Sequence, residues 1–451
     1  MKLVTRVDEA VNRQNIPPGS RIYVSGNAAT PQVLLRELSR NENITDVELL
    51  SLLLLGELDS LFCEECCERI THRVLFSSGL SRAALNSGQA MYQLMHLSDI
   101  PRQLRNYLRP DIAFVSVSGP DKGGNYSLGT TVEGVLAAIE TAKASGGLVI
   151  AERNAQMPFI LGSTVPAEMI DFVIDTDYQL PLNPSHRPDE RAERIGRLIA
   201  ERYIHDGCTL QFGIGEIPEA VTDAILAKGV RDLGVHTELF ATAMRKLVNA
   251  GVITNKYSRR NFSVSTLFLA ENQEGYDWFG MNSSIQSRPC DLTNSILHIA
   301  GEPKMVAINS AIGVDLHGNI WADSLNANQI YSGIGGQSDF LRGAYLSEGG
   351  VPIIGLKAST NSGKSKILEK SPEGVTVTAI AADPVVIVTE YGAFDPRGLS
   401  ICEHAVGIAH LAEPQLRDDL LRHIYESDRF HKPRQALKDN RPKGFTAFED
   451  I

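Results

Sequence analysis

One glutamate stands out as a side chain that could do chemistry. Glu238 lies in the segment GVHTELFA (residues 234–241), which begins like a buried strand and continues with apolar Leu239 and Phe240. A carboxylate in this setting is either the solvated end of a strand or a group kept partly out of water for chemistry. His236, two residues earlier, is more typical of a buried, satisfied histidine than of a catalytic base. The residues alone leave both interpretations of Glu238 open.

A glycine-containing turn is the next candidate. The segment FGIGEIPEAV (residues 212–221) places Gly213 and Gly215 between an apolar strand and a helix that starts near Pro218. Such a turn lets the backbone approach a ligand and directs unpaired N–H groups at anions. It is not a dinucleotide fingerprint, because G-x-G-x-x-G requires glycine where Pro218 stands. The segment therefore predicts either a ligand contact or a plain tight turn.

A second glycine-rich segment, YSGIGGQSDFLRGAYLSEGG, runs over residues 331–350. Gly333, Gly335 and Gly336 precede a helical pattern, so backbone N–H groups ahead of that helix could stabilise an oxyanion or a phosphate. A plain loop is the alternative interpretation.

Two other segments resemble known binding motifs but lack residues that those motifs require. ASTNSGKSKI resembles a phosphate-binding loop, but Ala358 stands where the first glycine is required, which argues against nucleotide hydrolysis. Cys63, Cys66, Cys67 and His72 invite a zinc site, yet no second Cys or His pair follows at a suitable spacing. We expect no metal, and we expect the cysteine segment to form a helix surface.

The composition limits the classes of protein to which the chain can belong. Its 451 residues exceed the size of one ordinary core, so two domains are expected. A net charge of -11 argues against a nucleic-acid partner. The longest apolar run, LLSLLLLG (residues 49–56), is far shorter than the roughly 20 residues of a membrane span and predicts a buried strand. With no signal-peptide pattern and six cysteines that suit a reducing compartment, a cytoplasmic protein is expected.

The elements that position these residues occur twice. GSRIYVSGNAATPQVLLREL, from residue 19, resembles GCTLQFGIGEIPEAVTDAIL, from residue 207. In each, an apolar strand ends at a glycine, Gly26 or Gly213, and a proline five residues later opens a helix. Two further landmarks repeat in the same order, namely D-x-x-G-N at residues 121 and 315 and Gly-Gly at residues 146 and 349.

We predict from this repeat an α/β protein made by internal duplication, with mostly parallel sheets. The copies occupy residues 1–190 and 191–425, and the proline-rich segment 180–194 connects them. The remaining tail, residues 426–451, is polar and basic and is expected to be a surface arm or a poorly ordered end.

Five segments, in this order, resemble the acetyl-CoA hydrolase/transferase family: GIGEIPEAV, GVHTELF, INSAIGVDLHGNIWADS, GIGGQSDFLRGAYLS and VTEYGAFDPRGLSICEHA. The resemblance covers nearly the whole chain, and in length the chain is most similar to the 4-hydroxybutyrate CoA-transferases. It implies two related Rossmann-like CoA-transferase domains, in agreement with the repeat.

The resemblance also implies a mechanism. Glu238 would be the nucleophile that attacks an acyl-CoA, giving an acyl-glutamyl anhydride and then a glutamyl-CoA thioester, with ping-pong kinetics. The backbone N–H groups of Gly335 and Gly336 would stabilise each oxyanion. No cofactor would be bound permanently, since coenzyme A is a substrate. The residues implied to bind CoA are Gly213, Gly215, Glu216, Ile217, Pro218, Glu219, Asn294 and Lys357.

The function implied is a CoA-transferase acting on acetyl-, butyryl- or 4-hydroxybutyryl-CoA and a free short-chain carboxylic acid, as a homodimer or larger homo-oligomer. An acyl-CoA hydrolase using the same glutamate is the nearest alternative. A non-catalytic CoA- or ligand-binding protein is an alternative of another class. A sugar-phosphate isomerase is disfavoured, because the resemblance spans both halves. Asn27, Thr30 and Gln211 are open candidates for the acyl pocket.

Overall fold

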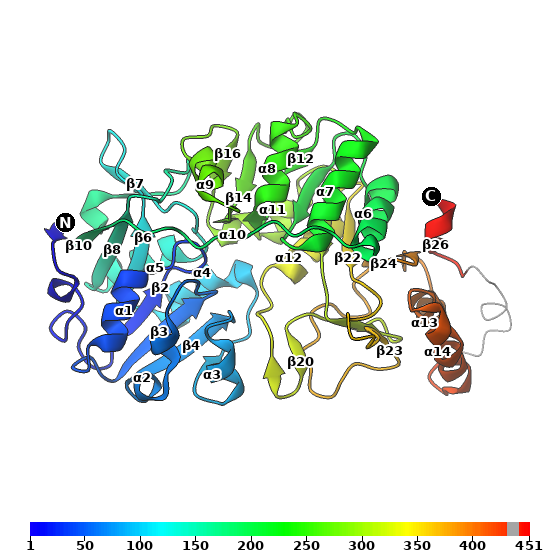
Figure 1. Cartoon of the computed structure of the whole chain (residues 1–451), viewed down its shortest axis with the longest axis horizontal. Coiled ribbons are helices and arrows are strands. Elements are labelled where there is room, and N and C mark those ends of the chain that lie inside the picture. The colour runs from blue at the N-terminus through cyan, green and yellow to red at the C-terminus, as the bar shows by residue number, and fades with distance from the viewer. Residues whose placement is uncertain (431–441) are drawn as a thin grey trace.

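The computed structural model of the chain describes residues 1–430 and 442–451. Two lobes lie side by side, with the N-terminal one drawn blue to cyan and the C-terminal one green to red (Figure 1). Each lobe is built on its own central sheet. The prediction of a two-part α/β fold with mostly parallel sheets is confirmed.

The N-terminal sheet has eight strands in the order β1-β10-β8-β6-β2-β3-β4-β5, and all neighbouring strands are parallel. Leucines of helix α1 (Gln32–Arg40) pack on one face and apolar residues of α5 (Val135–Ala144) on the other. The strands are β1 (Lys2–Val4), β2 (Arg21–Val24), β3 (Val47–Leu52), β4 (Ile70–Phe76), β5 (Met91–Tyr92), β6 (Ile112–Val117), β8 (Leu148–Asn154) and β10 (Phe172–Thr176).

The C-terminal sheet has seven strands in the order β12-β11-β17-β22-β24-β25-β26. Helices α6 (Glu190–Tyr203) and α7 (Glu216–Lys228) cover one face, and α12 (Gln337–Leu346) and α13 (Ile401–His410) cover the other. No helix in the described part of the chain is long and apolar enough to cross a membrane. The strands are β11 (Thr209–Phe212), β12 (Gly234–Val235), β17 (Met305–Asn309), β22 (Val351–Gly355), β24 (Val386–Thr389), β25 (Gly392–Phe394) and β26 (Phe445–Ala447).

The two sheets repeat one topology. The order β3-β2-β6-β8-β10 in the first corresponds to β12-β11-β17-β22-β24 in the second. The D-x-x-G-N turns also match, because the Oδ1 atoms of Asp121 and Asp315 each accept N–H bonds from the residues two and four positions later. The repeat read from the sequence is therefore present in the fold.

The end of the chain differs from the expectation. Residues 445–447 form β26, which pairs antiparallel with β25 and extends the C-terminal sheet. The Phe448 ring then lies beneath the guanidinium groups of Arg194 and Arg197, at 3.9 and 4.3 Å. A surface arm is thus the wrong description of this part, because strand β25 would otherwise leave its edge unpaired. The remainder of the predicted tail at residues 431–441 lies outside the described residues.

Backbone hydrogen bonds join the two lobes. The N–H of Leu97 donates to the carbonyl of Gly335 at 3.0 Å, and the N–H of Phe268 donates to the carbonyl of Thr130 at 2.8 Å. The Ser98 hydroxyl donates to the Asp339 carboxylate at 2.8 Å. Gly335 lies beside the Glu238 side chain, and Phe268 follows Leu267, whose N–H donates to the Glu238 carbonyl. The contact between the lobes therefore also positions the candidate site.

Candidate active site

Glu238 lies in a short irregular link between β12 and strand β13 (Leu239–Phe240). Its carbonyl accepts N–H bonds from Leu267 at 2.9 Å and Thr266 at 3.2 Å, and it accepts the Ser265 hydroxyl at 2.8 Å. These bonds fix the backbone, and the half-buried side chain lines a cavity of about 380 Å³. Of the two interpretations of Glu238, the solvated strand end is therefore wrong.

The pKa of the Glu238 carboxyl is raised by some of its surroundings and lowered by others. Burial raises its pKa to about 7, and the neighbouring Asp339 carboxyl acts in the same direction. The Asn294 amide donates to Glu238 Oε2 at 2.7 Å, and this bond and the N–H of Gly336 favour the charged form. A carboxylate with few solvating partners and a pKa near neutrality remains available as an anion at physiological pH.

The backbone of the glycine-rich segment before α12 lies in close contact with this carboxylate. A Cβ atom at residue 336 would lie 2.0 Å from Glu238 Oε2 and 2.0 Å from Asn294 Nδ2. Gly335 has φ 61°, and a Cβ there would lie 3.7 Å from Glu238 Oε1. The two glycines proposed as oxyanion donors are thus adjacent to the proposed nucleophile. At residue 336 only glycine allows this approach, whereas at residue 335 it is the left-handed backbone that favours glycine.

The cavity opens where the order of strands reverses in the C-terminal sheet. The C-terminal ends of β11 and β17 lie on either side of this point, which is where open parallel sheets bind ligands. The side chains of Gln211 and Asn309 bond to each other there at 3.0 Å. Gly213, Ile217 and Pro218, three of the residues implied to bind CoA, line the same cavity.

The other residues implied to bind CoA do not line this cavity. Gly215 and Glu219 line a small adjoining recess, and Glu219 forms a partly buried ion pair with Lys246 at 2.6 Å. Asn294 contacts Glu238 directly, as described above.

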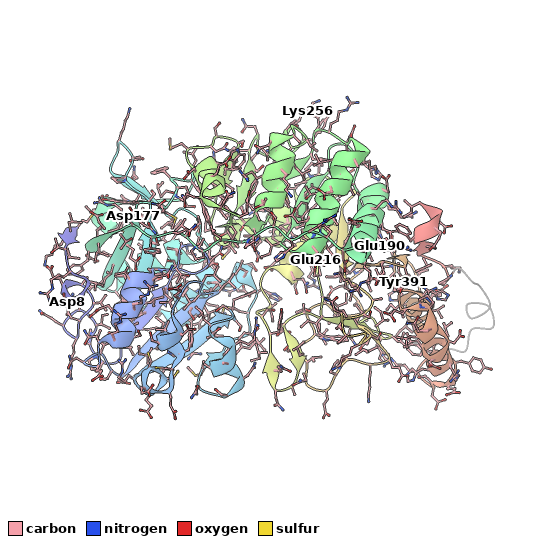
Figure 2. The ribbon with its side chains drawn as sticks, viewed as in Figure 1. Asp8, Asp177, Glu190, Glu216, Lys256 and Tyr391 are labelled. Atoms are coloured by element: carbon pink, nitrogen blue, oxygen red, sulfur yellow. The ribbon has the colours of Figure 1, made fainter. Side chains whose placement is uncertain are left out.

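Lys357, expected beside the CoA phosphates, lies in an ion-pair cluster, and its contact with CoA stays a prediction. It contacts Glu216, which Figure 2 labels at the start of α7, and it lies 2.8 Å from Asp189. Burial lowers the pKa of Lys357, but the two carboxylates outweigh burial and raise it overall.

Two acidic residues near Glu238 escaped the sequence analysis. Glu133 is buried, and its Oε2 has no hydrogen-bond partner among the described residues. Burial, and after it the charge of Glu238, raises the pKa of Glu133 to about 8. Burial likewise raises the pKa of Asp339 to about 7, against the hydrogen bonds from Ser98. No motif surrounds Glu133, whereas Asp339 follows the GIGGQ segment and could have been proposed from that position.

His236 does not face the cavity. Its Nε2 lies 2.7 Å from the carbonyl of Thr293, and its Nδ1 lies 3.5 Å from the Glu302 carboxylate. Because Thr293 precedes Asn294, the imidazole fixes the backbone that presents an amide to Glu238. His236 is thus a buried, hydrogen-bonded histidine, as its pattern indicated.

Taken together, this geometry suits acyl transfer. The Glu238 carboxyl, whose pKa is about 7, lines a cavity, and the Asn294 amide and the backbone N–H of Gly336 bond to its oxygens. None of the described residues that line the cavity is Lys, Arg or His. The site therefore favours an uncharged electrophile, and backbone donors rather than cationic side chains would stabilise the oxyanion.

Comparison with known proteins points the same way. Residues 2–182 match the acetyl-CoA hydrolase/transferase N-terminal domain, and residues 272–424 match the corresponding C-terminal domain. The 4-hydroxybutyrate coenzyme A transferase of Clostridium kluyveri is 35% identical over 428 residues, which cover 93% of this chain and 96% of the relative.

Solved structures share the fold over almost the whole chain. RipA from Yersinia pestis superposes with a TM-score of 0.85 at 29% identity, covering 94% of this chain and 96% of RipA. A 4-hydroxybutyrate CoA-transferase from Porphyromonas gingivalis gives a TM-score of 0.78 at 28% identity, covering 94% of this chain and 97% of that one.

Proposed function

Because the chain belongs to the acetyl-CoA hydrolase/transferase family and is a CoA-transferase, we propose that it moves CoA between a short-chain acyl-CoA and a free carboxylate through covalent catalysis at Glu238. The acyl groups are of the acetyl, butyryl or 4-hydroxybutyryl class. CoA serves as a substrate and not as a resident cofactor.

The reaction proceeds in two symmetrical halves. A Glu238 oxygen attacks the thioester carbonyl, and the oxyanion collapses with cleavage of the C–S bond to give an acyl-glutamyl anhydride and CoA thiolate. The thiolate attacks the glutamyl carbonyl and releases the acyl group as a carboxylate, which leaves a glutamyl-CoA thioester. An incoming carboxylate reverses both steps, so the two acids never occupy the site together and the kinetics are ping-pong.

The observation that carries the proposal is the pair of donors at Glu238. Asn294 holds one oxygen at 2.7 Å, and the glycine backbone reaches the same carboxylate. These groups orient the nucleophile in the ground state, and they would stabilise the oxyanion that forms on the glutamyl carbonyl when the CoA thiolate attacks it. Removal of one such donor commonly costs about 3 kcal/mol in the transition state.

Intact-protein mass spectrometry tests the proposal. After incubation with butyryl-CoA and then borohydride, the protein should gain a CoA adduct or a reduced side chain that peptide mapping assigns to Glu238. Glu238→Gln, which keeps the shape and the bond to Asn294, should remain unmodified and lose transfer by at least about a thousandfold. An adduct on the Gln variant, or near-normal transfer by it, would contradict the mechanism.

The same preparation separates a transferase from a hydrolase. Apolar Leu239, Leu267 and Leu269 line the cavity and would limit water around the anhydride. We therefore expect CoA release to need an acceptor acid. Steady release of CoA thiol from butyryl-CoA without acetate would instead identify an acyl-CoA hydrolase that uses the same glutamate.

A further inference from the structure

One buried amide in the cavity wall has no partner. The Asn27 side chain is 0% exposed, and neither its Nδ2 nor its Oδ1 makes a hydrogen bond to any described residue. Asn27 lines the cavity into which Glu238 projects. A buried carboxamide without partners is costly, so such a group in a native structure calls for a partner that the protein itself does not supply.

The backbone holds this amide in a fixed place. Asn27 has φ 51°, its N–H donates to the carbonyl of Leu53 at 2.8 Å, and its carbonyl accepts the Thr30 hydroxyl at 2.7 Å. Asparagine is one of the few residues other than glycine that adopt this left-handed conformation readily. The backbone that carries this side chain is therefore anchored just after β2, in the lobe opposite the one that carries Glu238.

Among the described residues that the N-terminal lobe contributes to the cavity lining, Asn27 has the polar side chain. The other cavity-lining side chains contributed by the described N-terminal lobe are Leu53 and Phe76, both apolar. Across the cavity, the amides of Gln211 and Asn309 satisfy each other. Gln337 donates to the carbonyl of Ser310 at 2.6 Å, and its Oε1 has no partner among the described residues. An acyl chain extending from Glu238 toward the N-terminal lobe thus meets apolar walls and one buried amide that has no partner among the described residues.

We propose that Asn27 selects acyl groups with a hydroxyl at their far end, an inference that rests on the proposed CoA-transferase function. A hydroxyl can donate to Oδ1 and accept from Nδ2 at once, which satisfies both atoms. An unsubstituted alkyl chain leaves both unpaired. A second carboxylate accepts from Nδ2 but places its charge beside Oδ1, in a cavity whose described lining has no cation.

Transfer rates with three donors test the inference. With acetate as acceptor, kcat/KM for 4-hydroxybutyryl-CoA should exceed that for butyryl-CoA by about tenfold and that for succinyl-CoA by about a hundredfold or more. Asn27→Leu, of similar size, and Asn27→Gly, which keeps the left-handed backbone without strain, should both bring the hydroxybutyryl-to-butyryl ratio close to one. Each ratio is measured within one preparation, so partial misfolding of a variant does not alter it.

Gln337→Leu is the matched control. It removes a second amide from the same cavity but from the C-terminal lobe, so the ratio should stay at the wild-type value. A wild-type ratio of one or less, a preference for succinyl-CoA, or an unchanged ratio in both Asn27 variants would overturn the inference. If butyryl-CoA labels Glu238 without any such preference, the transferase function stands and the role of Asn27 falls. If no donor reacts and Glu238 stays unlabelled, both fall.

Discussion

At the scale of single residues, the ionisation of Glu238 sets the pH at which the enzyme can work. Its pKa is raised to about 7, and the nucleophile is the anion, so kcat/KM should fall about tenfold per pH unit below that value. Asp339 contributes to the raised pKa, and Asp339→Asn should therefore move the midpoint of the profile to lower pH. Transfer rates between pH 5 and pH 9 measure both. A flat profile, or a midpoint that rises in the variant, would contradict this assignment.

Glu133 gives a prediction on stability instead. Its pKa is about 8 in the folded protein and near 4.5 in an unfolded chain, so its stabilising contribution is complete below pH 4.5 and is lost as the pH rises through 8. Glu133→Gln removes this loss. The variant should gain roughly 1–3 kcal/mol relative to wild type between pH 5 and pH 8.

Urea unfolding at the two pH values measures this difference. The exposed Glu42→Gln is the control and should show no such gain. If Glu133→Gln and wild type changed in parallel with pH, Glu133 would already be ionised in the folded protein.

Some of these residues could be predicted from the sequence and others could not. Glu238 was recognisable because apolar neighbours follow it and because its segment resembles a known family. Glu133 and Asn27 have no such local pattern, and their properties come from burial between segments that are distant in the chain. Composition and spacing do not report that kind of burial, so only the structure identified Glu133. Asn27 was one of three open candidates for the acyl pocket, and the structure added that its amide is buried and unpaired among the described residues.

At the scale of elements, the turn before α12 controls the site. In Gly336→Ala the new methyl group would overlap the side-chain ends of Glu238 and Asn294, which can move without unfolding the protein. We expect the fold and the thermal midpoint to be nearly unchanged and kcat to fall at least about a hundredfold.

Gly119→Ala is the matched control, because a Cβ at that position would contact nothing within 4 Å. It should keep both stability and activity. Unfolding of Gly336→Ala alone would assign the glycine to folding, and normal turnover would remove this loop from the chemistry.

Elements were predicted well where a local signal marks them. A strand, a glycine and a helix with a proline at its first turn occur at β2 and α1 and again at β11 and α7, because turn and capping preferences act over a few residues. Pro31 caps α1, whereas α7 begins at Glu216, two residues before Pro218. Strand β26 was missed, since three half-buried residues carry no alternating pattern of their own. It becomes a strand by pairing with β25, which lies about fifty residues earlier in the chain.

At the scale of the whole molecule, the terminal strand should matter for stability and not for catalysis. Removal of residues 442–451 exposes the edge of β25 and deletes the Phe448 contacts with Arg194 and Arg197. We expect a loss of about 1–3 kcal/mol, seen as a thermal midpoint several degrees lower, with unchanged kcat at 25 °C. Phe448→Ala should give part of this shift. A wild-type midpoint in the truncated chain would show that β26 contributes nothing.

The duplication was readable from three ordered landmarks, and the matching strand orders of the two sheets confirm it. The way the lobes face each other was not readable, because it depends on contacts such as Ser98 with Asp339 that join residues far apart in the chain. The domain boundary at residue 190 stays a prediction.

The cavity draws its walls from both copies of the repeat. Asn27, Leu53 and Phe76 come from the first, whereas Glu238 and its glycine loop come from the second. Mutations in the first half of the gene can therefore change which acids are accepted while the reacting groups stay intact.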